Sequence, residues 1–139
     1  MKMTAKIILR SLAATPLKIA LVYAGIIGLL YMDFRPLPLW VGDALAYFVH
    51  FAAAYLLALW VFHRSSVRKL DGFVVAFNFI VISALLEIFL AALLRGPSMG
   101  LWLGLFTWQS ALVNACYLIG VMSAWAQVRL KIKRVVSQG

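Results

Sequence analysis

Residues 73–94 form one uninterrupted apolar run that carries a single ionisable residue, Glu87. A helix of about 20 apolar residues, rising about 1.5 Å per residue, spans the hydrocarbon core of a bilayer. A carboxylate inside such a helix costs about 2.5–3.5 kcal/mol on insertion scales and is tolerated where it faces other helices, water or a ligand. The run therefore predicts a transmembrane helix, and function depends on what Glu87 faces.

The composition assigns the whole chain to the membrane class. Of its 139 residues, 65% are hydrophobic and 12% are charged, whereas a soluble domain has about 45–50% apolar and about 25% charged residues. The mean hydropathy is +1.01. The formal charge of +9 comes from basic blocks that flank apolar runs, which is the pattern that orients membrane proteins. We therefore expect a single membrane domain and no nucleic-acid partner.

The apolar runs predict a four-span transmembrane domain over residues 17–128, between two basic segments. Residues 1–16 have the spacing of a basic amphipathic segment on a membrane surface, and Pro16 restarts the chain. A cleaved signal peptide is the competing interpretation, but the first run ends without a small-residue cleavage site. Residues 129–139 form a basic cytoplasmic tail. The expected helices cover residues 17–32, 42–62, 73–94 and 106–128. The first is short for a span, so a start before Pro16 stays open.

Three glycines at a spacing of four, Gly96, Gly100 and Gly104, precede the fourth span. If they are helical, they form a stripe on which another helix backbone can pack closely. A glycine-rich loop that leads back into the membrane is the alternative. The spacing alone leaves both interpretations open.

The distribution of basic residues predicts the orientation. With four spans, both termini and the turn after the second span share one side. Cytoplasmic loops carry the excess of Lys and Arg, so the richer side is the cytoplasm. We expect an all-α four-helix transmembrane bundle with both termini cytoplasmic. Only Arg35 and Arg95 lie on the other side, against Lys2, Lys6, Arg10, Lys18, Arg64, Arg68, Lys69, Arg129, Lys131, Lys133 and Arg134.

A polar face on the second span points to a binding pocket. Asp43, Tyr47 and His50 are spaced i, i+4, i+7, which places them on one side of a helix. The third span runs the opposite way, so Glu87 should lie at the depth of His50, in the outer half of the bilayer. A carboxylate and an imidazole at one depth can share a proton or a hydrogen bond.

Further polar residues extend this predicted pocket. Arg95 stands at its outer mouth, where it can neutralise Asp43, and Gln109 and Asn114 approach from the fourth span. Such side chains also serve as interhelical hydrogen bonds without binding anything, so a purely structural role stays open. The candidate ligand-binding residues are Asp43, Tyr47, His50, Glu87, Arg95, Gln109 and Asn114.

Sequence patterns for catalysis, metals and cofactors are missing. The chain has two histidines and four carboxylates with no metal-ligand spacing, and no glycine-rich phosphate loop precedes a helix. Its single cysteine, Cys116, lies in an apolar stretch and is expected to be a packing residue. We expect no cofactor and no metal, and an enzymatic role for His50 and Glu87 is the less favoured interpretation.

Three motifs within the spans resemble those of VanZ-like membrane proteins, a family named for teicoplanin resistance. That family carries Asp-Lys-x-x-His-Phe, Glu-x-x-Gln followed by Arg, and Asp-x-x-x-Asn in successive helices. The residues that match, within residues 40–121, are Asp43, Phe48, Glu87, Arg95, Asn114 and Gly120. The family's Lys, His, Gln and Asp are replaced by Ala44, Tyr47, Leu90 and Ser110.

The resemblance implies a small, non-enzymatic envelope protein of a bacterial inner membrane that acts near lipid-linked glycans. With it, the polar residues favour a pocket that opens outward and binds a lipid headgroup or a lipid-linked glycan. One alternative is an accessory subunit of a larger membrane complex, because the chain has almost no mass outside its spans. Another is a small proton-coupled transporter. The expected partners are membrane lipids, with a larger complex or a second copy of the chain as further options.

Overall fold

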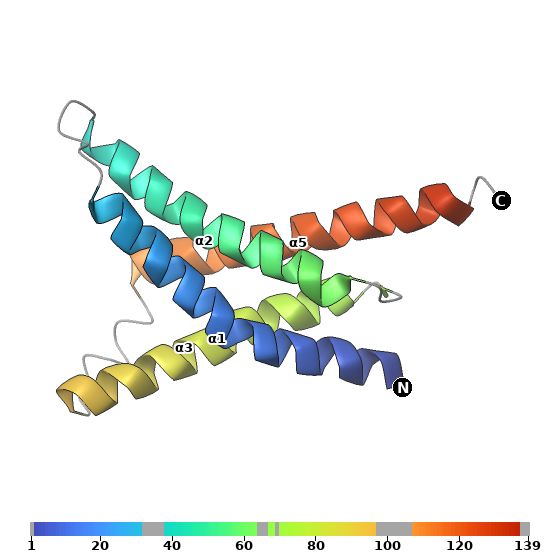
Figure 1. Ribbon diagram of the computed structural model, residues 1–139, viewed down its shortest axis with the longest axis horizontal. Coiled ribbons are helices and arrows are strands. Elements are labelled where there is room, and N and C mark those ends of the chain that lie inside the picture. Colours follow the sequence, from blue (N-terminus) through green and yellow to red (C-terminus); the bar gives the residue numbers. More distant parts are fainter. Residues whose placement is uncertain (1, 32–37, 64–66, 69, 97–106, 137–139) are drawn as a thin grey trace.

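The computed structural model of this chain describes residues 2–31, 38–63, 67–68, 70–96 and 107–136 (Figure 1). Nearly all of this part is helical, and its long helices are α1 Lys2–Leu30, α2 Leu39–Phe62, α3 Asp71–Arg95 and α5 Trp108–Val136. They pack together, which confirms the predicted all-α four-helix bundle.

The four helices form a ring in which each packs against two neighbours. α2 contacts α1 and α5, and α3 also contacts α1 and α5, so α2 and α3 lie across the ring from each other. Successive helices run in opposite directions. The start of α1, the end of α2, the start of α3 and the end of α5 therefore lie at one end of the bundle, on the right of Figure 1.

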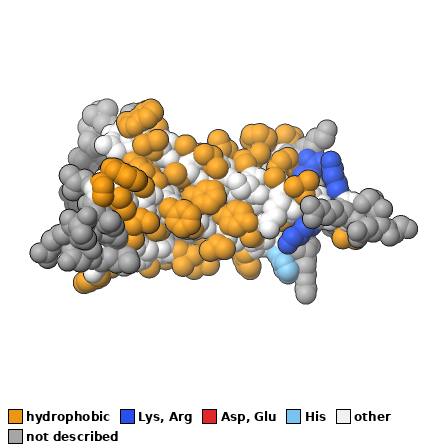
Figure 2. Space-filling model, turned by 90° about the horizontal axis from the view of Figure 1, so that it is seen from above, with side chains coloured by type: hydrophobic (Ala, Val, Ile, Leu, Met, Phe, Trp, Pro, Cys, Tyr) orange, Lys and Arg blue, Asp and Glu red, His pale blue; other side chains and the backbone are white. Residues whose placement is uncertain are grey.

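Each helix is long and apolar enough to cross a membrane. The candidate spans are Ala5–Leu30, Trp40–Phe62, Asp71–Leu94 and Trp108–Lys133, each of 23 to 26 residues. The face of the bundle seen in Figure 2 is covered by hydrophobic side chains, while Lys and Arg side chains gather at one end. That end holds both ends of the chain, and we call it the basic end. The molecule is a small multi-pass membrane protein with four candidate spans.

The first helix differs from the prediction. α1 runs without interruption through Pro16, so Pro16 does not restart the chain, and the apolar window already begins at Ala5. Pro16 is exposed on the surface of the bundle. One residue earlier, the Thr15 hydroxyl donates a 2.9 Å hydrogen bond to the Ser11 carbonyl. Prolines are tolerated in membrane helices where Ser and Thr side chains support the backbone in this way.

Two other predicted boundaries also change. The fourth helix was expected to end at Val128, but α5 continues to Val136 and makes most of the predicted basic tail helical. Gly96 follows the last residue of α3 with φ +81°, a conformation that favours glycine, and so it terminates a helix rather than forming part of a stripe. Gly100 and Gly104 lie outside the described residues.

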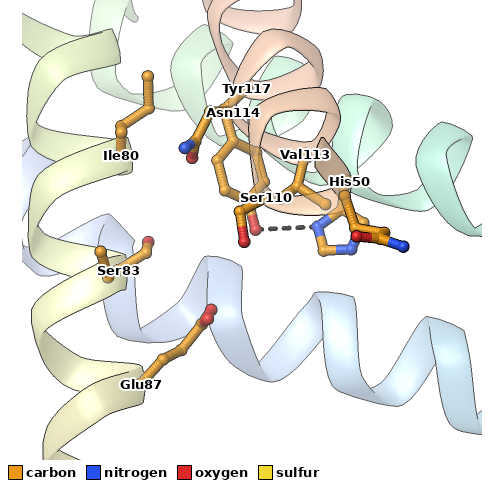
Figure 3. Close-up of a pocket in the computed structure, with 10 residues that line it drawn as sticks. His50, Ile80, Ser83, Glu87, Ser110, Val113, Asn114 and Tyr117 are labelled. Atoms are coloured by element: carbon orange, nitrogen blue, oxygen red, sulfur yellow. Dashed lines mark hydrogen bonds between the residues drawn. The ribbon is translucent and has the colours of Figure 1, made fainter. Parts of the chain in front are cut away.

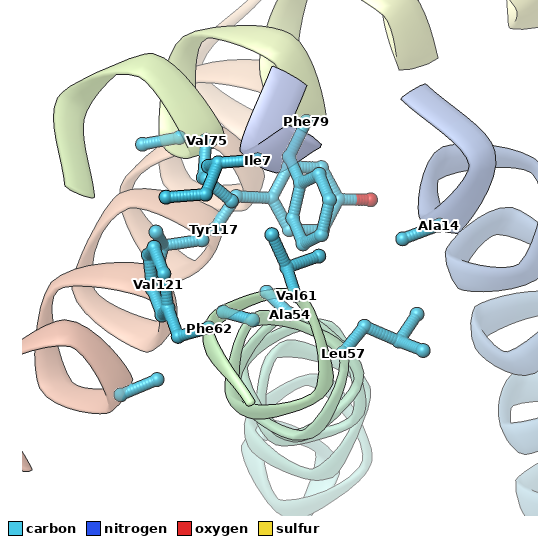
Figure 4. Packing of buried hydrophobic residues seen from close by; sticks show 13 residues of the cluster. Ile7, Ala14, Ala54, Leu57, Val61, Phe62, Val75, Phe79, Tyr117 and Val121 are labelled. Atoms are coloured by element: carbon cyan, nitrogen blue, oxygen red, sulfur yellow. The ribbon is translucent and has the colours of Figure 1, made fainter. Parts of the chain in front are cut away.

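The apolar core lies in the half of the bundle next to the basic end. It is built from the second half of α2, the first half of α3 and the middle of α5, with α1 closing one side (Figure 4). Small residues dominate where α2 meets α5, which brings these two helices close together. The core consists of Ile7, Ala14, Ala54, Leu57, Ala58, Val61, Phe62, Val75, Ala76, Phe79, Tyr117, Val121 and Ala124.

Gly120 marks the closest approach of α5 to α2. A Cβ atom at this position would lie 2.8 Å from the Phe51 carbonyl oxygen and 3.2 Å from both the Ala54 Cβ and the Tyr55 backbone nitrogen. Backbone atoms cannot move aside as a flexible side chain can. A glycine is therefore required here by the packing of the two backbones.

We expect Gly120→Ala to destabilise the protein by about 1–3 kcal/mol, the usual cost of overpacking, despite the better helix propensity of alanine. The measurement is thermal or denaturant unfolding in detergent. Gly28→Ala is the matched control, because a Cβ at Gly28 meets no atom within 4 Å. Equal stability of the two variants would contradict the close contact between α2 and α5.

Candidate functional site

A cavity of about 200 Å³ lies among α2, α3 and α5 (Figure 3). Ser83 and Glu87 project into it from α3, facing Tyr117 and His50 on the other side. Polar residues outnumber apolar ones in its lining, although apolar atoms form the larger part of its surface. The polar lining residues are His50, Ser83, Glu87, Gln109, Ser110, Asn114 and Tyr117, and the apolar ones are Ile80, Ala84 and Val113.

The cavity occupies the half of the bundle that is remote from the basic end. Gln109 and Ser110 belong to the first turn of α5, and Glu87 precedes Arg95, the last residue of α3, by two turns. At about 1.5 Å per residue, Glu87 lies roughly 12 Å from that end of α3. The cavity therefore extends from the end opposite the basic end towards the middle of the spans.

The structure brings together some of the predicted site residues. His50, Glu87, Gln109 and Asn114 line the same cavity. The cavity lining includes His50 as its contribution from α2, and neither Asp43 nor Tyr47 belongs to it. Asp43 is exposed near the start of α2. The Arg95 side chain lies outside the described part of the chain.

The partner of His50 differs from the expected one. Its Nδ1 atom lies 2.9 Å from the Tyr117 hydroxyl, and the two share a hydrogen bond, drawn dashed in Figure 3. Their rings also meet edge to face, with centroids 5.4 Å apart. Among the described residues, Glu87 has no hydrogen-bond or ion-pair partner. In this structure His50 is therefore hydrogen-bonded to Tyr117 and not to Glu87, although both His50 and Glu87 line the same cavity.

Lys18 is the most important residue that the sequence analysis misplaced. It was counted with the basic residues at the cytoplasmic surface, but its side chain is 0% exposed within the bundle. Its Nζ donates a 2.9 Å hydrogen bond to the Phe79 carbonyl oxygen and another to Ser83 Oγ. The same ammonium lies 3.4 Å from the centroid of the Tyr117 ring, a cation–π contact.

The position of Lys18 follows from the continuity of α1. With the helix starting at Lys2, Lys18 lies about 24 Å along its axis, near mid-span. A signal was available, since Ser11, Thr15 and Lys18 share the spacing i, i+4, i+7 and are all fully buried. Ser11 accepts a 2.6 Å hydrogen bond from the Asn78 amide of α3. This polar face of α1 packs on α3, and the break assumed at Pro16 concealed it.

Lys18 and Glu87 form the charged part of the site. The two side chains interact electrostatically but make no ion pair. Ser83 connects the two residues. It accepts a hydrogen bond from Lys18 and lies one helical turn before Glu87 on α3. The ammonium lies behind the cavity wall, because both Ser83 and Tyr117 touch it and line the cavity.

Neither metal-ligand geometry nor comparison with known proteins assigns a function to this site. In the described part of the chain, no three His, Cys, Asp or Glu side chains gather as metal ligands would. No family model, curated protein or solved structure matches this chain. The resemblance to VanZ-like proteins is thus without support from a family match, and the fold and cavity identify only a small four-span membrane protein.

We expect Ser83→Ala to destabilise the bundle by about 1–3 kcal/mol, since it deprives a buried ammonium of an acceptor. Unfolding in detergent measures the effect. Ser123→Ala is the control, because Ser123 is a half-buried serine of α5 outside the cavity. If both variants unfold at the same temperature as the parent, the hydrogen bond from Lys18 to Ser83 contributes nothing to stability.

Proposed function

We propose that this protein is a non-enzymatic membrane protein that binds the polar headgroup of a lipid or lipid-linked glycan in the cavity among α2, α3 and α5. The observation that carries the proposal is the Glu87 carboxylate. It lines the cavity without a hydrogen-bond or ion-pair partner among the described residues, and it is exposed in the isolated bundle. Carboxylates within membrane spans are costly unless something satisfies them, and a ligand that supplies hydrogen bonds would do so.

The size and chemistry of the cavity support a small polar ligand. At about 200 Å³ it is smaller than the pockets of about 300–1,000 Å³ that enclose drug-sized molecules. Its wall offers carboxylate, amide and hydroxyl groups, which match ligands that both donate and accept hydrogen bonds. A headgroup attached to acyl chains that remain in the bilayer fits this combination.

The distribution of charge supports an outward-facing cavity. With the buried Lys18 set aside, the sequence topology assigns ten of the thirteen basic residues to the side of the two chain ends and two, Arg35 and Arg95, to the opposite side. The positive-inside rule then assigns the basic end to the cytoplasm and the cavity to the outer half of a bacterial inner membrane. The VanZ-like assignment agrees with this arrangement but rests on a few matching residues, among them Asp43, Glu87 and Asn114.

A proton-coupled transporter is the second candidate, favoured by the position of Lys18. Transporters place their substrate and ion sites near the middle of the membrane, and Lys18 and Glu87 lie in the interior of their spans. A role as accessory subunit has no comparable observation in its favour. It would be recognised by co-purification with a much larger assembly.

We expect the protein extracted into lipid nanodiscs to retain a defined lipid that native mass spectrometry detects. Ala84→Leu should displace it, because the larger side chain fills the cavity. Glu87→Gln should weaken retention about tenfold to a hundredfold, the equivalent of the about 1.5–3 kcal/mol that a hydrogen bond to a charged group contributes. Ala111→Leu is the matched control, since Ala111 is exposed on α5 outside the cavity.

Three results would contradict the proposal. Retention that is equal in Ala84→Leu and Ala111→Leu would place the lipid elsewhere. Flux that depends on pH and is abolished by Glu87→Gln would favour the transporter. Migration as part of a large complex, unaffected by either cavity variant, would favour the accessory subunit.

Reporter fusions test the proposed orientation. Green fluorescent protein fused to the C-terminus should fluoresce in bacterial cells, and alkaline phosphatase at the same position should be inactive, because both ends of the chain share the basic end. Fusions truncated after Leu30, the last residue of α1, should give the reverse pattern. An active phosphatase at the full-length C-terminus would invert the orientation and turn the cavity to the cytoplasm.

A further inference from the structure

Two side chains of opposite charge lie at different distances from the cavity surface. The Glu87 carboxylate lies on the wall itself, in the half remote from the basic end. The Lys18 ammonium lies one layer behind the wall, in contact with Ser83 and Tyr117, which both line the cavity. The site therefore has a negative group on its surface and a positive group beneath it.

These charges cancel within the site. The other side chain of the lining that readily carries a charge is His50. Its hydrogen bond to the Tyr117 hydroxyl is compatible with a neutral imidazole. Asp43 is outside the lining, so it does not change the balance. A ligand that brings a further net charge into this membrane-embedded site would leave that charge uncompensated, which is strongly unfavourable away from water.

We infer that the cavity selects an uncharged, hydroxyl-bearing headgroup, such as the sugar of a glycolipid, and rejects both anionic and cationic headgroups because Lys18 and Glu87 neutralise each other. This inference rests on the proposed function, since it specifies the ligand of the same cavity. It assigns to Lys18 the role of a positioning and charge-balancing residue that does not itself touch the ligand.

The hydrogen-bonding groups of the wall fit such a ligand. Ser83 Oγ already accepts a hydrogen bond from Lys18, so its own hydroxyl hydrogen is left to donate to a ligand oxygen. Glu87, one turn further along α3, accepts from a ligand hydroxyl. Neighbouring sugar hydroxyls both donate and accept, so one ring can satisfy the two positions together. A phosphate would be repelled by the Glu87 carboxylate. An ammonium group would contact that carboxylate but would add a second positive charge to one that Lys18 already balances.

The test offers three lipids with identical acyl chains in phosphatidylcholine nanodiscs. They are monoglucosyl-diacylglycerol, which is neutral, phosphatidylglycerol, which is anionic, and a trimethylammonium diacyl lipid, which is cationic. Retention by the full-length protein is measured by native mass spectrometry. We expect the parent protein to retain the glucolipid about tenfold or more better than either charged lipid.

Charge-removing variants should switch this preference. Glu87→Gln leaves Lys18 uncompensated and should shift retention towards phosphatidylglycerol. Lys18→Met leaves Glu87 uncompensated and should shift it towards the cationic lipid. The double variant should restore the preference for the glucolipid, at lower affinity. A merely structural Lys18 would lower retention of all three lipids together, so the direction of the switch identifies its role.

Each outcome decides one of the two proposals. If the parent protein retains none of the three lipids above the background, the proposed function is overturned, and the inference with it. If it retains a charged lipid best, or if Glu87→Gln keeps the parent preference, the charge balance is overturned while lipid binding stands. Glu87→Gln, which keeps Lys18, decides the matter even if Lys18→Met does not fold. If methyl glucoside in solution binds as tightly as the glucolipid, charge selection stands and a lipid source is overturned.

Discussion

The buried ammonium of Lys18 is the interaction on which the rest of the structure depends. It joins α1 to α3 through the Phe79 carbonyl and Ser83, and to α5 through the ring of Tyr117. An ammonium inside a membrane-spanning bundle is stable only when such partners surround it. The three helices must therefore meet at this depth. Since two of the three partner residues also line the cavity, the same requirement fixes part of the cavity wall.

Basic residues of this chain consequently have different physical roles that composition alone does not separate. Lys131 and Lys133 are exposed near the end of α5, as expected of charges that orient a membrane protein. Arg10 instead donates hydrogen bonds to the Val61 and His63 carbonyls, which stabilises the C-terminus of α2. Lys18 is buried altogether. The excess of basic residues on the side of the chain ends still predicts the orientation when Lys18 is left out of the count.

Sequence patterns were sufficient for the helices and for part of the site. Each span was predictable because a long apolar run has one stable form in a bilayer, whereas the helix ends depended on local details at Pro16 and Gly96. His50 and Glu87 were located because antiparallel spans relate depth to residue number. Lys18 was not, because its burial depends on partners 61 and 65 residues further along the chain. Only the fold brings those partners to it.

The unequal packing of the two halves of the bundle bears on how the cavity functions. At Gly120 the backbones of α5 and α2 are in near contact, and the apolar core fills the space from there to the basic end. The cavity occupies the opposite half, where the first turns of α5 carry Gln109 and Asn114. Access from the basic end would require separating two backbones and an apolar core that stabilises the fold. A transporter needs that opening, whereas a protein that binds a headgroup from one side does not. The packing therefore favours binding over transport.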